Sequence, residues 1–119
     1  MDAPSLPEFV EFLREWRRLP RSREIAPGTE LEADLGITGD DGRDLLVATE
    51  RRFNVTMSSY ENGYREAFNL NPNEFLFHSE GIGPDLSALL GGPSPVARTL
   101  TAGDLYDAVT RALAGRELI

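Results

Sequence analysis

The sequence predicts a mostly α-helical fold: a small bundle of three to four helices in a single domain, residues 1–119, with an irregular insertion at about 56–99, before the last helix. Three observations predict it. Apolar residues recur at helical spacing in the stretches 5–19, 38–53 and 100–113. Residues suited to helix N-termini stand at the start of each stretch. The span 56–99 has no regular period and contains many Gly and Pro residues.

The first expected helix covers residues 5–19. Ser5 and Glu8 match a capping box, in which each side chain accepts a hydrogen bond from a backbone N–H of the first turn. Pro20 is expected to end the helix. The connector 21–33 should then run as an extended loop whose apolar residues tuck under the helices, with a short strand as the alternative.

The second expected helix follows the stretch DLGITGDDGRDLLVATERRFNV, residues 34–55. Its start should lie between Thr38 and Asp41, because Thr and Asp cap helices and acidic groups are favourable at an N-terminus. Asn54 is a candidate for the left-handed residue that ends it. The period places three charged residues on the outward side: Asp44, Glu50 and Arg51.

The sequence says less about the secondary structure of residues 56–99. Its spacing is compatible with a short amphipathic helix over 57–70 and with one helical turn over 85–90, while 75–77 is an apolar run too short to classify. The last helix is clearer, because Thr101 and Asp104 form an acidic capping box and Gly115 is expected to end the helix. The predicted core comprises Phe9, Phe12, Leu13, Trp16, Leu35, Ile37, Leu45, Leu46, Phe53, Val55, Leu105 and Val109.

The formal charge is −8, and it is unevenly distributed. Residues 25–50 hold seven acidic residues and a single base, Arg43. Such a field repels nucleic acid and anionic membranes and attracts basic protein surfaces, so we expect neither a nucleic acid nor a membrane as partner. The alternative is a solvated acidic face that serves only solubility.

The absence of Cys excludes disulfides, thiol nucleophiles and thiolate metal sites. Residues 1–20 contain charges and prolines throughout and no apolar signal-peptide region, and no apolar run approaches the length of a membrane span. These observations predict a cytoplasmic protein.

The sequence offers no clear pattern for metal or acid–base chemistry. Four acids lie on or near the Gly-rich loop, Asp34, Asp40, Asp41 and Asp44, but their spacing does not match a calcium-binding EF-hand, and helix capping explains them. His78, the single histidine, has no converging partners. We therefore expect no metal, no cofactor and no catalytic residue.

Three features, in order, resemble acyl and peptidyl carrier proteins: an apolar first helix, the DLG loop opening an acidic helix that ends at Phe53, and the ending LTAGDLYDAV. More narrowly, GITGDDG, RRFNV and LTAGDL are similar to a bacterial family of acyl-carrier-like proteins of unknown function. The resemblance implies an acyl-carrier-like bundle whose acidic second helix docks on basic patches of partner enzymes.

The chain departs from the carrier pattern at the attachment site. Carriers bind phosphopantetheine through a serine at the start of the second helix, and this chain has Gly39 there. Thr38 is one position away and branched, Ser58 and Ser59 lie beyond the helix, and Asp40 replaces a leucine. The resemblance therefore implies the scaffold and the acidic helix without phosphopantetheinylation.

The leading hypothesis is a non-enzymatic interaction or regulatory protein. It would present an acidic helix face to a basic protein surface, such as that of a biosynthetic or regulatory enzyme. The candidate partner-binding residues are Thr38, Asp40, Asp41, Asp44 and Glu50. Two alternatives stay open: a true carrier with an unusual attachment site at Thr38 or elsewhere, and an acidic inhibitor or immunity-type protein for a basic nuclease or toxin.

Overall fold

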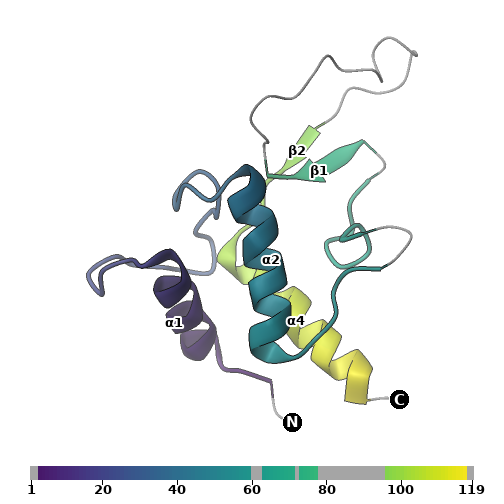
Figure 1. Cartoon of the computed structure of the whole chain (residues 1–119), viewed down its shortest axis with the longest axis horizontal. Helices are drawn as coiled ribbons and strands as arrows, with labels where there is room; N and C mark the ends of the chain where they lie inside the picture. Colours follow the sequence, from purple (N-terminus) through teal and green to yellow (C-terminus); the bar gives the residue numbers. More distant parts are fainter. Residues whose placement is uncertain (1–2, 60–62, 72, 78–95, 118–119) are drawn as a thin grey trace.

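The computed structural model describes residues 3–59, 63–71, 73–77 and 96–117. Along the chain it contains α1 (Leu6–Arg17), α2 (Gly39–Phe53), β1 (Glu74–Leu76), β2 (Val96–Arg98) and α4 (Ala102–Glu117) (Figure 1). The predicted dominance of helix is confirmed. The small sheet was not predicted, so the described part is a mixed, helix-dominated structure and not purely a helical bundle.

Local capping chemistry sets the ends of α1. The Ser5 hydroxyl accepts a hydrogen bond from the Glu8 amide at 3.3 Å, as expected. The helix ends when Arg18 adopts a left-handed conformation, with φ 58°, and the Leu19 amide donates to the Arg14 carbonyl at 2.9 Å. The helix therefore stops two residues before Leu19, through a left-handed cap and not through Pro20.

Helix α2 begins and ends within the predicted limits. Its first residue is Gly39, and its first turn contains Asp40 and Asp41. At the other end Asn54 is left-handed, with φ 55°, and the Val55 amide donates to the Glu50 carbonyl at 3.0 Å.

The predicted capping box of α4 is present. The Thr101 amide donates to the Asp104 carboxylate at 3.0 Å, and the Asp104 amide donates to the Thr101 hydroxyl at 3.1 Å. The prediction that Gly115 ends the helix is wrong, because α4 continues to Glu117. A glycine inside a helix costs free energy relative to alanine, but it leaves the backbone hydrogen-bonding groups available.

The connector between α1 and α2 tucks beneath the helices, as expected. Leu31 is fully buried and Ile25 is 7% exposed. The Leu31 amide donates to the Leu100 carbonyl, and the Ala102 amide donates to the Thr29 carbonyl, each at 2.9 Å. These bonds attach the connector to the start of α4. They form an isolated antiparallel bridge, which is shorter than a strand.

Strands β1 and β2 pair in parallel, with Phe75 opposite Ala97. A salt bridge between Glu74 and Arg98, 3.1 Å long, reinforces the pair. The short helix expected over 57–70 does not form in the described residues of that span, where turns and a Ser59–Gly63 bridge occur instead. The helical turn expected over 85–90 and His78 lie outside the described residues.

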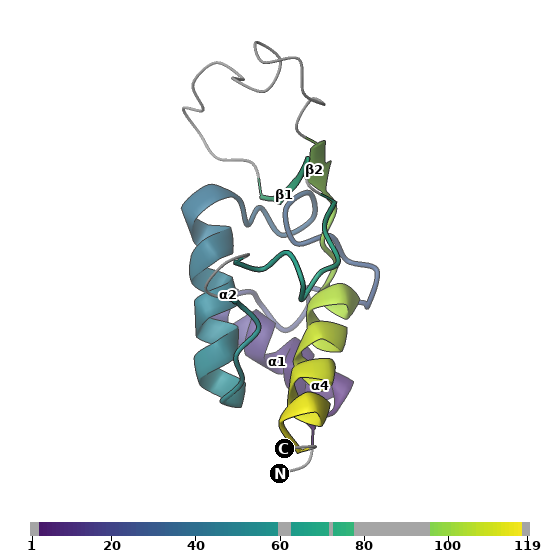
Figure 2. The same cartoon turned by 90° about the vertical axis from the view of Figure 1, so that its right-hand side faces the viewer.

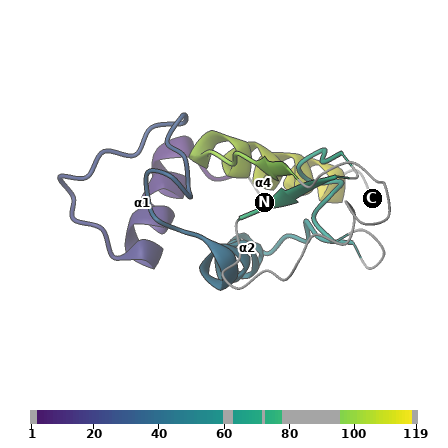
Figure 3. The same ribbon diagram turned by 90° about the horizontal axis from the view of Figure 1, so that it is seen from above.

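The core lies where the three helices meet. Figure 2 shows α2 and α4 on either side of the view with α1 behind them, and Figure 3 shows the same triangle from above. The ring of Phe9 lies 5.6 Å from the rings of both Phe53 and Tyr106, so one aromatic side chain of α1 joins all three helices. Ten of the twelve predicted core residues are buried, and Phe12 and Trp16 pack partly buried against them.

None of the helices in the described part combines the length and apolar character that crossing a bilayer requires.

Candidate functional site: the acidic face of α2 and a pocket beside α4

The outward side of α2 carries an acidic ridge. Asp40, Asp44 and Val47 follow at helical spacing i, i+4 and i+7, so they lie along one line of the helix surface. Both acids are exposed, and Val47 is 37% exposed. The opposite side of the helix is buried through Leu45, Leu46, Thr49 and Phe53. Helical periodicity alone therefore separates these outward residues from the core. The name acidic ridge refers below to Asp40, Asp44 and Val47.

The two carboxylates of the ridge are available for binding. The carboxylates of Asp40 and Asp44 form neither a hydrogen bond nor an ion pair with any residue that the structure describes. Asp41 is also exposed, but its carboxylate lies 3.5 Å from the Arg17 guanidinium. An exposed ion pair of this length contributes little to stability, so Asp41 also remains open to a stronger partner.

The loop before α2 is held from α1 by Arg17. Its Nε donates to the Leu35 carbonyl at 3.1 Å, and its Nη2 donates to the Gly36 carbonyl at 3.0 Å. Gly36 has φ +68°, a left-handed conformation that glycine adopts without strain. Arg17 therefore fixes the direction in which the chain enters α2.

The position that the sequence resemblance assigns to the attachment serine offers no hydroxyl. Gly39 has φ +56°. Its neighbour Thr38 occupies the N-cap position, but its side chain does not cap the helix and instead donates to the Glu32 carboxylate. The hydroxyl nearest to the start of α2 is thus engaged within the protein.

Glu50 does not lie outward, contrary to the sequence prediction. It is partly buried, and its carboxylate accepts a hydrogen bond from the Tyr64 hydroxyl at 2.6 Å and one from the Met57 amide at 2.9 Å. The amide and hydroxyl of Ser58 also approach it, each at 3.4 Å. Glu50 therefore ties α2 to the chain that follows, and the exposed acids are confined to the first turns of the helix.

The contact with Glu50 changes the acidity of Tyr64. Burial, followed by the hydrogen bond to Glu50 and the charge of that carboxylate, raises the pKa of Tyr64 from 10.0 to about 12. All three effects disfavour a phenolate at this position.

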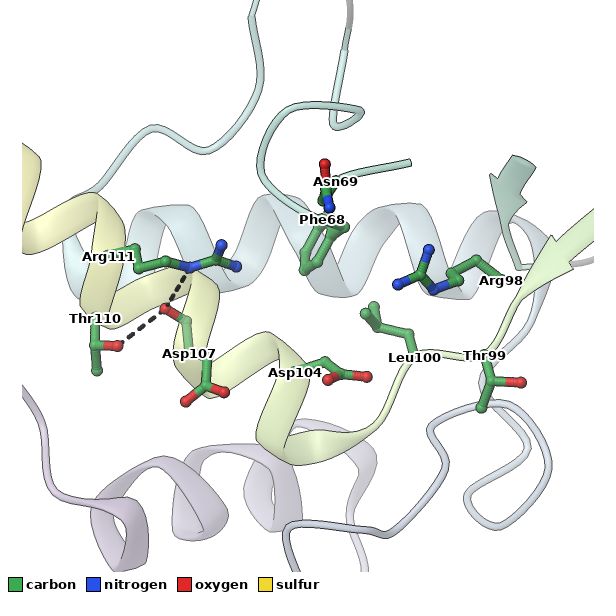
Figure 4. Close-up of a pocket in the computed structure, with 9 residues that line it drawn as sticks. All are labelled: Phe68, Asn69, Arg98, Thr99, Leu100, Asp104, Asp107, Thr110 and Arg111. Carbon is green, nitrogen blue, oxygen red and sulfur yellow. Dashed lines mark hydrogen bonds between the residues drawn. The ribbon is translucent and has the colours of Figure 1, made fainter. Parts of the chain in front are cut away.

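A pocket of about 450 Å³ lies beside α4, between this helix, β2 and the turn at 68–69 (Figure 4). Apolar side chains of Phe68 and Leu100, which are 7% and 6% exposed, line it together with charged groups. Its other lining residues are Asn69, Arg98, Thr99, Asp104, Asp107, Thr110 and Arg111. Sequence reasoning missed this pocket, and the only signal for it was the helical spacing of Asp104, Asp107 and Arg111.

In the described part of the chain, no three His, Cys, Asp or Glu side chains are grouped so that they could hold a metal ion. Asp34, one of the acids near the Gly-rich loop, accepts a hydrogen bond from the Glu30 amide at 2.8 Å. It therefore stabilises the connector.

No protein-family model, curated protein or solved structure matches this chain.

Proposed function

We propose that this chain is a non-enzymatic interaction or regulatory protein of the cytoplasm that docks on a basic protein partner through the acidic ridge of α2. The observation that carries the proposal is the exposure of Asp40 and Asp44 without any partner among the described residues. In the folded protein these charges lie on a rigid helix, so they are presented in a constant geometry.

The chemistry of the ridge specifies the partner. Two carboxylates one helical turn apart suit a pair of Arg or Lys side chains, and Arg can bind a carboxylate with two parallel hydrogen bonds. Val47 adds an apolar contact one turn further along. The charges would steer association and select the partner, while the apolar contact would slow its dissociation.

The extent of the docking surface is smaller than the sequence suggested. Glu50 binds the chain after α2, and Arg51 is exposed beyond Val47. The proposed surface therefore consists of the acidic ridge, with Asp41 and Thr38 at its margin.

Affinity capture from cell extract, followed by mass spectrometry, tests the proposal. Asp40→Arg and Asp44→Arg should each remove the bound basic protein. Glu15→Arg is the matched control, because Glu15 is an exposed acid on α1 and the substitution makes the same change in net charge. A partner set that survives both α2 substitutions, or that Glu15→Arg removes equally, would refute docking at the ridge.

A phosphopantetheinylation assay distinguishes the proposal from the carrier function. Under the proposal, incubation with a phosphopantetheinyl transferase and coenzyme A should leave the intact mass unchanged, because residue 39 has no hydroxyl and the Thr38 hydroxyl is hydrogen-bonded to Glu32. A gain of one phosphopantetheine that Thr38→Ala abolishes would replace the proposal with the carrier function.

A further inference from the structure

The pocket beside α4 is independent of the docking surface proposed above, since no residue of α2 lines it. Its volume of about 450 Å³ falls in the range of small-molecule sites. Phe68 and Leu100 are the two lining residues that are buried in the core, so they form its apolar floor. The charged groups around this floor determine which ligand the pocket can hold.

Two guanidinium groups flank the apolar floor, one on each side of Phe68. Figure 4 shows Arg98, from β2, and Arg111, from α4, pointing toward each other with Phe68 between them. Both retain unused donors. The Nη1 of Arg98 donates to the Glu74 carboxylate. The Nε and Nη2 of Arg111 donate to the carbonyls of Asp107 and Ala67, respectively. The remaining N–H groups have no acceptor among the described residues.

An acceptor of negative charge lies on the α4 side of the pocket. The Oδ2 of Asp104 accepts a hydrogen bond from the Thr101 amide in the capping box. Its Oδ1 has no donor in the part of the chain that the structure describes. In Figure 4 the Asp104 carboxylate lies on the side of Leu100 that faces α4. The pocket thus combines free guanidinium donors, a free carboxylate oxygen and an apolar floor.

We propose that this pocket binds a small zwitterion with an apolar body, of the α-amino-acid type. The carboxylate of the ligand would accept hydrogen bonds from the free N–H groups of Arg98, its ammonium group would donate to Asp104 Oδ1, and its side chain would cover Phe68 and Leu100. A ligand with only one charge would lack one of these two charge-assisted interactions and would therefore bind more weakly.

Titration of the full chain with L-leucine, followed through backbone amide NMR signals, tests the proposal. The expected result is a saturable shift of signals from Leu100, Asp104 and Arg111. Two matched probes each lack one charge: 3-methylbutylamine has no carboxylate, and 4-methylpentanoate has no ammonium. Each should bind about tenfold more weakly than leucine, as the loss of one charge-assisted hydrogen bond implies. A probe that binds as tightly as leucine, or no saturable shift up to ~10 mM leucine, would overturn the proposal.

Two substitutions locate the carboxylate of the ligand. Arg98→Gln should weaken leucine binding about tenfold. Glu74→Gln should strengthen it by up to about fivefold, because it frees Arg98 from its salt bridge while Glu74 itself does not line the pocket. Glu15→Gln is the control, since it removes an exposed charge on α1 that does not line the pocket, and it should leave the affinity unchanged. Equal affinity in all three variants would exclude Arg98 from the site and overturn the proposed arrangement.

Discussion

Phe77 lies directly on Gly42, so that a Cβ atom added to Gly42 would come within 2.2 Å of the Phe77 ring. Both residues are buried, and Phe77 adopts a left-handed conformation with φ 56°. A bulky residue rarely has a positive φ, so the packing of its ring must stabilise this backbone. Gly42 therefore serves as a packing surface inside α2, and it joins the helix to the chain that leaves β1.

Gly42→Ala should destabilise the protein by about 1–3 kcal/mol, although alanine favours helix, because the new methyl group would overlap a rigid ring. Chemical denaturation measures the change. Gly115→Ala is the matched control. It also lies in a helix, but no atom lies within 4 Å of its added Cβ, so a gain of up to about 1 kcal/mol is expected. A neutral Gly42→Ala would show that Phe77 is displaced at little cost.

Arg17→Ala should lower the free energy of unfolding by about 1–2 kcal/mol, because the Leu35 and Gly36 carbonyls would lose a charged donor. Amide hydrogen exchange should also become faster in the loop before α2. Arg21→Ala removes an exposed arginine from the connector and should change stability by less than about 0.5 kcal/mol. Equal effects of the two substitutions would contradict the role of Arg17 in holding the loop.

Tyr64 should make stability sensitive to alkaline pH. Its pKa is about 12 in the folded protein and 10.0 for the ordinary side chain, so folding favours the protonated phenol. The corresponding stability is fully present below pH 10 and is lost as the pH rises through about 12.

Denaturation curves from neutral to alkaline pH can isolate this contribution. Tyr64→Phe should be less stable at neutral pH and should lose less stability above pH 10 than the parent protein. Tyr106→Phe is a useful comparison, because that phenol donates to the Pro4 carbonyl and not to a carboxylate. An unchanged alkaline profile in Tyr64→Phe would show that the contact with Glu50 is not maintained in solution.

Phe53→Ala should cost about 3–5 kcal/mol, because this ring is 8% exposed and contacts the rings of Phe9 and Phe12. Val47→Ala, six residues earlier on the exposed side of α2, should change stability by less than about 0.5 kcal/mol. Thermal or chemical denaturation distinguishes the two sites. Similar losses would mean that Val47 is packed against the protein in solution.

The acidic ridge could be predicted from sequence because helical periodicity is a local property. Once α2 extends from Gly39, Asp40 and Asp44 must lie away from Leu45 and Phe53. Glu50 could not be placed by the same reasoning, because its hydrogen-bonding partners come from the chain beyond the helix. The pocket beside α4 could not be predicted from sequence either, since Phe68, Arg98 and Arg111 belong to separate segments and only folding brings them together.

The sequence by itself determined the three helices, three of their caps and most of the core. Ser5, Asn54 and the Thr101–Asp104 pair act over three or four residues, and the apolar stripes follow the helical period, so their effects appear in the sequence. Tertiary structure decided where these elements meet. The pairing of β1 with β2, the contact of Phe77 with Gly42 and the hold of Arg17 on the loop before α2 join residues far apart in the chain. Such contacts depend on shape and distance in the folded protein, and no local pattern of residues encodes them.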